Sequence, residues 1–256
     1  METALDFDLS ARYDYHDYWH SNLSYGAKIS KGKETKFYIA ANVGNIYPSI
    51  ADYDKHIGAL KPENNYQFEA GIEGQYLDFN FKAAPYLRYI DDKINLINPL
   101  GSYEYFATNI GRARILGVDF EAVKTFGPYR ATLLYSLMDN KIKPYGEGGY
   151  KTSQFAPKQV ISFTNTLNIE SWRFIAILFA KSNQYSGNDK TGDKLPGYAD
   201  LEFTVEKKIA GAEIFATASN ILDRHYAING GYGAFYPCAG RTFKLGVRYQ
   251  FSKSKP

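Results

Sequence analysis

Apolar and polar side chains alternate strictly along much of the chain. In residues 5–15 every odd position is apolar or aromatic, and every even position is polar or charged. Residues 241–251 repeat the pattern, with Phe, Leu, Val, Tyr and Phe alternating with Thr, Lys, Gly, Arg and Gln. Successive side chains of a β-strand point to opposite faces, so each segment predicts a strand with one apolar and one polar face.

The same alternation predicts about 12 strands and no amphipathic helix of useful length. Each segment has about ten residues, which at roughly 3.3 Å per residue crosses the hydrocarbon core of a bilayer when tilted. The predicted strands cover residues 5–15, 22–29, 37–43, 66–76, 79–89, 109–124, 129–137, 158–169, 172–180, 199–206, 213–222 and 241–251.

The connections between these strands alternate between short turns and long links. Outer-membrane barrels have short turns on one rim and long loops on the other, whereas a Greek-key sandwich has no reason to alternate so regularly. The fold class is therefore predicted to be all-β, an antiparallel up-and-down transmembrane β-barrel. Long links are expected at residues 45–64, 91–108, 139–157, 181–197 and 223–240.

Composition agrees with this interpretation. The chain has 256 residues with 23 Tyr and 17 Phe, and tyrosine suits both strands and a lipid–water boundary. The net charge of +3 is too small to indicate nucleic-acid binding. The single cysteine, Cys238, has no partner for an intrachain disulfide. No run of 18 apolar residues is present, and residues 1–4 lack the features of a signal peptide.

Seven short motifs follow one another along the chain. They are Ala11-Arg12-Tyr13-Asp14-Tyr15, Tyr47-Pro48-Ser49 with residues 50–53, Leu60-Lys61-Pro62-Glu63, Asn109-Ile110-Gly111-Arg112 with residues 117–121, Leu195-Pro196-Gly197-Tyr198, residues 220–226, and Pro237 with residues 240–243. In this order they resemble the C-terminal part of the β-barrel of TonB-dependent outer-membrane receptors.

The resemblance implies a protein of the bacterial cell outer membrane of a Gram-negative organism. Family members carry out energised uptake of scarce ligands such as ferric siderophores, haem or cobalamin. Their barrel of about 22 strands surrounds an N-terminal plug on which the TonB complex pulls. The chain is then expected to be a partial receptor, with residues 1–251 as the C-terminal half of the barrel without the plug, and residues 252–256 as a polar tail.

The resemblance also implies the partners. Outer-membrane lipid would surround the barrel, and the barrel-assembly machinery would recognise the C-terminal strand ending at Phe251. A plug domain and TonB are expected only with the full-length receptor. No nucleic-acid partner is expected, and the small-molecule ligand stays unknown because family members differ chiefly in their loops.

No pattern in the sequence supports catalysis. The four histidines, His16, His20, His56 and His225, fall in loops or at strand ends, and Cys238 has no partner at metal-ligand spacing. The chain is therefore predicted not to be an enzyme, with no cofactor and no metal site.

Two sets of residues are candidates for ligand contact. Binding residues concentrate in loops on a rigid scaffold, so the loop tyrosines come first, although they also suit a membrane boundary. These are Tyr47, Tyr53, Tyr145, Tyr150, Tyr232 and Tyr236. The second set faces the lumen, where charges of opposite sign also pair across strands and set the register. It contains Arg88, Asp119, Glu121 and Arg248, with Glu69, Glu73, Asp200, Glu202, Glu206 and Lys244.

Two alternatives stay open. A self-contained 12-stranded outer-membrane barrel acting as a passive channel or adhesin has the same strand pattern. A soluble β-sheet binding module would bury the apolar faces instead of exposing them to lipid. Partition into detergent separates the second alternative from the membrane hypotheses.

Overall fold

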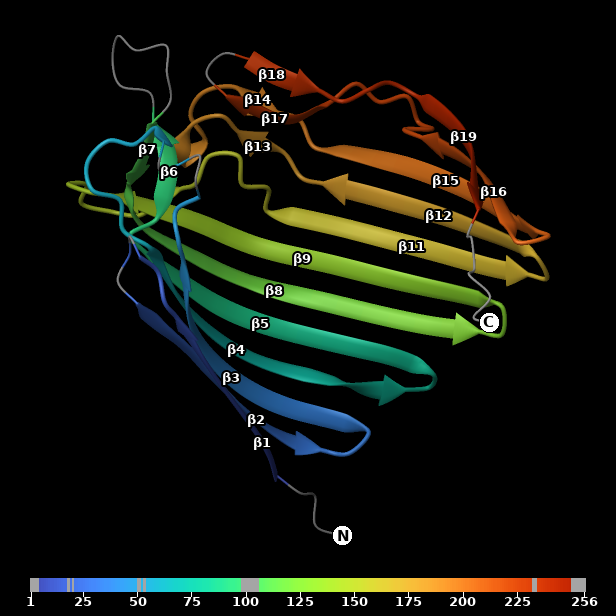
Figure 1. Cartoon of the computed structure of the whole chain (residues 1–256), viewed down its shortest axis with the longest axis horizontal. Helices are drawn as coiled ribbons and strands as arrows, with labels where there is room; N and C mark the ends of the chain where they lie inside the picture. Colours follow the sequence, from blue (N-terminus) through green and yellow to red (C-terminus); the bar gives the residue numbers. More distant parts are fainter. Residues whose placement is uncertain are drawn as a thin grey trace, which may run out of the picture. The chain divides into compact units, whose positions relative to one another are not determined.

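The computed structural model is built almost entirely from antiparallel strands (Figure 1). It describes residues 5–17, 19, 21–49, 52, 54–97, 106–231 and 234–249. One 13-stranded sheet contains the 12 predicted strands, each hydrogen-bonded to the next one along the chain, with a short strand added beside one of them. The prediction of an antiparallel up-and-down arrangement is confirmed.

The order of the main sheet is the order of the sequence. It consists of β1 (Leu5–Asp14), β2 (Asn22–Gly32), β3 (Thr35–Ile46), β4 (Glu63–Tyr76), β5 (Phe79–Asp91), β8 (Gly111–Phe126), β9 (Tyr129–Pro144), β11 (Gln159–Ile169), β12 (Trp172–Lys181), β15 (Tyr198–Ile209), β16 (Ala212–Ser219) and β19 (Thr242–Tyr249).

The remaining short elements lie in the links that the sequence pattern leaves without structure. β10 (Lys151–Thr152) pairs with β9, and the 3-10 turn η1 spans Asn188–Lys190. Three two-stranded ribbons are β6 (Ile94–Ile97) with β7 (Phe106–Asn109), β13 (Gln184–Tyr185) with β14 (Lys194–Leu195), and β17 (Ala227–Gly231) with β18 (Ala234–Pro237).

Several predicted boundaries are wrong. The strand predicted to continue to residue 222 ends at Ser219, and Asn220 adopts a φ of 49°. Asn109 belongs to β7 and not to the strand that follows, because Ile110 lies outside both strands and Gly111 adopts a φ of +133°. β9 continues to Pro144, beyond the predicted start of a loop at Asp139. Alternation is weak after Asp139, so only pairing with β10 reveals this end of the strand.

Every short connection of the main sheet is a two-residue turn. These turns lie at residues 33–34, 77–78, 127–128, 170–171 and 210–211. Leu77 and Asp78 have φ of 45° and 63°, and Ala210 and Gly211 have φ of 47° and 85°. A positive φ at both central positions is the signature of a type I′ turn, whose twist matches that of the flanking strands. The predicted alternation of short and long connections is confirmed.

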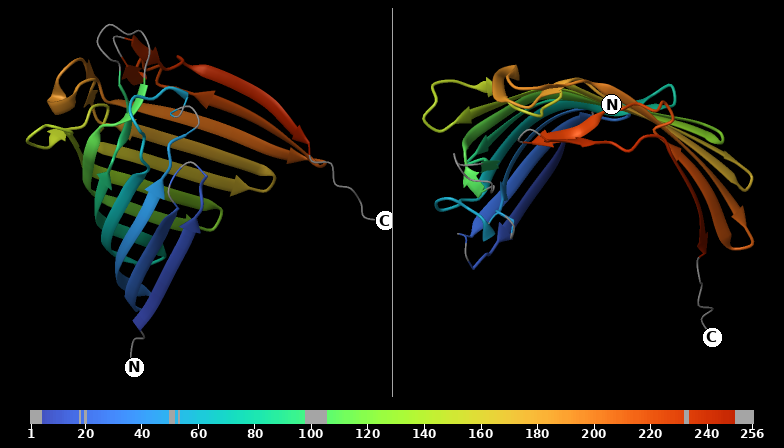
Figure 2. Two further views of the ribbon diagram at one scale, coloured as in Figure 1. Left: turned by 60° about the vertical axis from the view of Figure 1, so that its left-hand side comes forward. Right: turned by 90° about the horizontal axis from the view of Figure 1, so that it is seen from above.

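The chain forms two compact units, which are described separately. The first contains Met1–Gly74, Ala83–Asp119 and Met138–Ser153, and the second contains Gln75–Lys82, Phe120–Leu137 and Gln154–Pro256. Figure 2 shows the blue to green strands of the first unit side by side, with its long links at one end of these strands. β6 and β7 stand beyond that end of the strands.

The apolar face of the strands is exposed in both units. In the first unit Leu9 is 83% exposed, and in the second Phe243 and Leu245 are 76% and 80% exposed. Such large apolar patches on a folded protein mark a surface that something other than water covers. No helix in the described part of the chain is long and apolar enough to span a membrane.

On the polar face, aromatic rings lie over glycines of the next strand. Tyr38 is paired with Gly71, and a Cβ at Gly71 would lie 2.5 Å from the Tyr38 ring. In the second unit Phe215 is paired with Gly246, where a Cβ would lie 2.4 Å from the ring. The ring fills the space that a missing side chain leaves, which stabilises a strand that would otherwise lose packing.

Strand β12 departs from the alternation, as its more apolar sequence indicates. Ile175, Ile177 and Phe179 pair with Thr204, Glu202 and Asp200, so they share the polar face of β15. The opposite face of β12 is also apolar. The polar face of the second unit therefore contains an apolar stripe.

Candidate functional site

The polar face of β1–β5 is held together by charged side chains that bond across strands. Lys28 Nζ lies 2.9 Å from Glu73 Oε1, and Lys36 Nζ lies 2.8 Å from Asp6 Oδ2. Both pairs are part-exposed and screened by water, so they contribute little to stability. Each pair joins two strands that flank a third, β2 with β4 and β3 with β1, so a slipped pairing of the strands would separate the opposite charges.

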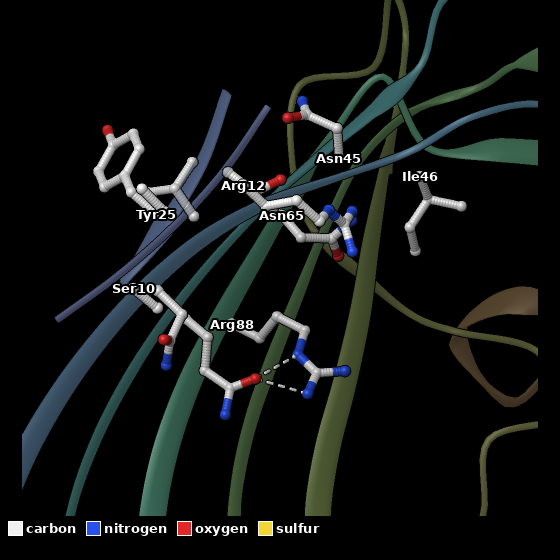
Figure 3. A pocket seen from close by; sticks show the side chains of 13 residues that line it. Ser10, Arg12, Tyr25, Asn45, Ile46, Asn65 and Arg88 are labelled. Carbon is white, nitrogen blue, oxygen red and sulfur yellow. Dashed lines mark hydrogen bonds between the residues drawn. The ribbon is translucent and has the colours of Figure 1, made fainter. Parts of the chain in front are cut away.

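A hollow of about 430 Å³ lies toward the loop end of this polar face (Figure 3). Four strands supply its polar side chains through cross-strand rows. One row runs from Arg12 to Ser24, and across Gly44 to Asn65. The next row contains Ser10, Asn42 and Gln67, with Gly26 between the first two. Arg88 reaches in from β5.

Arg88 is anchored by an uncharged partner. Its Nε and Nη2 donate hydrogen bonds of 3.0 Å and 2.6 Å to Gln67 Oε1, drawn as dashed lines in Figure 3. Gln67 Nε2 in turn donates to Glu69 Oε2 at 3.2 Å, and Tyr38 Oη donates to the other oxygen of Glu69. The guanidinium is thus oriented by a chain of hydrogen bonds while its charge has no direct carboxylate partner among the described residues.

Hydrogen bonds join two long links of the first unit, the one between β3 and β4 and the one between β5 and β8. Asn109 Nδ2 donates to the carbonyl oxygens of Lys61 and Asp92 at 3.0 Å and 2.6 Å, and its Oδ1 accepts from Lys61 N at 2.8 Å. Buried Glu63 accepts from Lys93 Nζ and from Ile94 N, both at 2.8 Å. These bonds fix the ends of two long links to each other.

In the second unit a single asparagine organises one link. Asn220 is only 2% exposed. Its Nδ2 donates to the carbonyl oxygens of Arg224 and Ala239 at 3.0 Å and 3.1 Å, and its Oδ1 accepts from Arg224 N at 2.9 Å. Asp223 Oδ1 accepts from Arg241 N at 3.0 Å, which ties the same link to the start of β19.

An aromatic pair lies beside this link. The rings of Tyr198 and Tyr226 stack with centroids 3.6 Å apart, and Tyr226 Oη donates to Asp200 Oδ2 at 2.8 Å. Burial raises the pKa of Tyr226, and its hydrogen bonds to Cys238 and Asp200 raise it further. Tyr226 therefore stays a neutral hydrogen-bond donor. The motif residues around it serve the structure of the link.

Comparison with protein families gives a match over most of the chain. Residues 2–221 match the model described as "TonB dependent receptor-like, beta-barrel". The chain belongs to this family. The resemblance recognised in the seven motifs is confirmed.

Solved structures of TonB-dependent receptors have the same fold as this chain. The siderophore receptor PirA from Acinetobacter baumannii matches with a TM-score of 0.75 and 17% identity over 97% of this chain and 44% of PirA. The copper transporter OprC matches at 0.69 and 17% over 91% and 40%. The ferric-catecholate import receptor Fiu from Escherichia coli K12 matches at 0.69 and 16% over 91% and 35%. The chain thus spans less than half the length of these receptors.

The predicted loop tyrosines that the structure describes have different partners. Tyr47 stacks on His16 with centroids 5.2 Å apart and accepts a hydrogen bond from Asn22. The hydroxyl of Tyr145 donates to Asp92 at 2.5 Å, and the Tyr150 ring lies 5.0 Å from the Arg114 guanidinium. Tyr236 is 66% exposed. Tyr53 and Tyr232 lie outside the described residues, as does Phe251.

The predicted lumen-facing charges lie in different surroundings. Arg88 lines the hollow. Asp119 is two residues beyond Gly117 on the polar face of β8, and Glu121 follows it on the same face. Arg248 pairs with Glu213, and its guanidinium carbon lies 5.6 Å from the Phe215 ring centroid. Only Arg88 of these four is part of the hollow.

Most of the hollow is not predicted from the sequence. Arg12 belongs to one of the seven motifs, and Ser24, Asn42, Asn65 and Gln67 are not among the candidate site residues. Alternation does place all of them on polar faces, so the signal is present. Their convergence depends on strand register, which one sequence does not specify.

No cluster of three or more metal-ligating side chains occurs among the residues that the structure places. The His16 ring is stacked on Tyr47 and lies 6.3 Å from the Trp19 ring centroid, so its surroundings are aromatic. The prediction of no metal site stays a prediction for the whole chain.

Proposed function

We propose that this chain is part of an outer-membrane receptor for energised uptake of a scarce ligand in a Gram-negative bacterium. The observation that carries the proposal is the exposure of one apolar face along consecutive strands, from Leu9 in β1 to Leu245 in β19. A soluble sheet would bury such a face, and lipid is the solvent that favours it. Family membership supports the same setting.

The ligand class proposed is ferric siderophore, haem or cobalamin. Related structures include a siderophore receptor, a ferric-catecholate import receptor and a copper transporter, which supports a metal or a metal chelate as cargo. The loop tyrosines and the lumen-facing charges Arg88, Asp119, Glu121 and Arg248 are the proposed contact residues. Uptake, and not catalysis, is the proposed activity.

The proposed partners follow from the family. Outer-membrane lipid covers the apolar face, and the barrel-assembly machinery recognises the last strand. In the complete receptor a plug fills the lumen, and TonB transmits energy to it. The barrel segment proposed here is residues 1–251, followed by the polar tail 252–256.

The membrane assignment is tested by labelling neighbouring positions on opposite faces. In a Cys238→Ser background, Leu245→Cys and its neighbour Lys244→Cys are each introduced and the chain is inserted into lipid vesicles. A thiol reagent confined to the bilayer should modify position 245 and spare position 244. Absence of labelling at 245, with the chain left in the soluble fraction, would support the soluble binding module instead.

Uptake is tested in cells that carry the complete receptor containing this segment. Accumulation of ferric siderophore, haem and cobalamin is measured with and without TonB. We expect accumulation of one class, lost without TonB. Accumulation that persists without TonB would favour the passive channel.

A further inference from the structure

The hollow on the polar face of β1–β5 has an excess of hydrogen-bond donors. Its thirteen lining residues include two arginines and no Asp, Glu, Lys or His. Arg12 is already balanced, since its Nε lies 2.9 Å from Asp14 Oδ2. Arg88 bonds to the neutral Gln67 through Nε and Nη2. A guanidinium has five N–H donors, so Arg88 keeps donors for a further acceptor.

Two buried polar atoms in the hollow lack partners. Ser24 Oγ and Asn65 Nδ2 are both inaccessible to solvent and make no hydrogen bond. A buried polar group without a partner costs roughly 1–3 kcal/mol, so such groups are exceptional and call for an explanation. The hollow therefore has two independent features that point to a ligand: these two unpaired atoms, and the Arg88 guanidinium without a carboxylate partner.

The space between these atoms is kept open by a glycine. Val43 pairs with Tyr25, so the next residue, Gly44, lies opposite Ser24. On its other side Gly44 pairs with Asn65, which places it between these two residues on the polar face. A Cβ at Gly44 would meet only Ser24 Oγ, at 4.0 Å. The volume of about 430 Å³ is in the range of small-molecule sites, roughly 300–1,000 Å³.

We propose that this hollow binds one carboxylate group of a small ligand, held by Arg88 with the help of Ser24 and Asn65. The proposal rests on the proposed function, since it assigns the polar face to ligand contact. One guanidinium without a carboxylate partner matches one negative charge, and its planar fork matches a carboxylate. A phosphate dianion places two charges on the one group that is bound, whereas the other carboxylates of a ligand such as citrate can stay in water.

The test uses the full chain in detergent micelles, with citrate as the carboxylate probe and inorganic phosphate as the comparison. Phenylglyoxal modification of arginines is followed by peptide mass spectrometry. Citrate should protect Arg88 from modification. It should not change the modification of Arg173, because the Arg173 guanidinium already has a carboxylate partner, Glu206, at 3.5 Å in the second unit. Phosphate at the same concentration should protect Arg88 several-fold less.

Calorimetric titration with citrate then measures how single substitutions change the affinity. Arg88→Gln and Gly44→Leu should each weaken citrate binding at least tenfold, the first by removing the charge and the second by filling the space. Asn65→Ala should weaken it about threefold. Arg173→Gln and Gly148→Leu, the matched controls, should change it less than twofold, because Gly148 has open space around it.

Each contrary result overturns the proposal. Wild-type citrate binding by both Arg88→Gln and Gly44→Leu would show that the hollow is not the site. Equal protection by phosphate would exclude carboxylate selectivity. Stronger protection by an end-blocked Asp-Gly-Asp peptide than by citrate would assign the hollow to a protein segment. Heat-modifiable migration confirms folding of each variant, and Arg88→Lys should keep part of the affinity.

The two proposals fail in different ways. If position 245 is labelled from lipid but citrate does not bind, the carboxylate site is wrong and the receptor assignment stands. If the chain stays out of membranes, the receptor assignment fails first.

Discussion

Asn109 in the first unit and Asn220 in the second each make three hydrogen bonds of the same kinds. In each case the side-chain amide donates to two backbone carbonyls, and its oxygen accepts one backbone N–H. The partners differ in sequence distance. Asn109 reaches back 48 residues to Lys61 in another link and 17 residues to Asp92 at the start of its own link. Asn220 reaches forward 4 and 19 residues within its own link.

The same side-chain amide thus stabilises two kinds of loop. The bonds of Asn109 join separate links, so they constrain a surface built from several loops. The bonds of Asn220 close a single link on itself before β19 begins. Burial also differs, since Asn220 is fully buried and Asn109 is half-buried, so water can replace more of the lost bonds at Asn109.

The largest effect is expected at Asn220. Asn220→Ala leaves the Arg224 N–H and two carbonyl oxygens without partners in a buried place, and should destabilise the second unit by about 3 kcal/mol. Urea unfolding followed by Trp172 emission in a Trp19→Phe background measures it. Asn220→Asp keeps the acceptor and should cost less. A shift below about 1 kcal/mol would show that the link closes without this residue.

Asn109→Ala should lower the stability of the first unit by less, about 2 kcal/mol, because the side chain of Asn109 is partly open to water. The matched measurement follows Trp19 emission in a Trp172→Phe background. We also expect faster proteolysis in residues 47–62 and not in residues 220–241. Equal proteolysis of both links would contradict the separation of the two asparagines.

Glu63→Gln tests whether charge matters at the join between links. Glu63 is buried with a side-chain exposure of 5%, and Lys93 is 36% exposed. The substitution keeps an acceptor for Ile94 N and removes the ionic contribution, so we expect a loss of about 1–2 kcal/mol. The same Trp19 unfolding experiment measures it. Glu34→Gln in a two-residue turn is the control and should change stability by less than about 0.5 kcal/mol.

The smallest effect is expected at Tyr145, whose side chain is exposed. The hydrogen bond to Asp92, with burial, raises the pKa of Tyr145 to about 12. The phenol donates only when protonated, so its stabilisation is complete below pH 10 and is lost as the pH rises from 10 to 12. Tyr145→Phe should abolish this part of the pH dependence of proteolysis in residues 139–150. An unchanged alkaline profile in the variant would exclude the role of this bond.

Much of the fold follows from local pattern. Alternation along residues 5–15 or 241–251 is enough to predict strands and their two faces, because side-chain direction in a strand depends only on position. Turn pairs such as Leu77-Asp78 follow from the length of the gap between strands. The seven motifs identify the family because they keep their order along the chain.

Tertiary structure decided the rest, because register and link conformation depend on residues far apart in sequence. Asn109 looks like the start of a strand until its amide is seen to bond to Lys61 and Asp92. Ser24, Gly44, Asn65 and Arg88 become one hollow only when four strands align, since a shift of one residue would turn each side chain to the other face. Alternation thus determined which face each side chain occupies, and cross-strand pairing decided which of them meet.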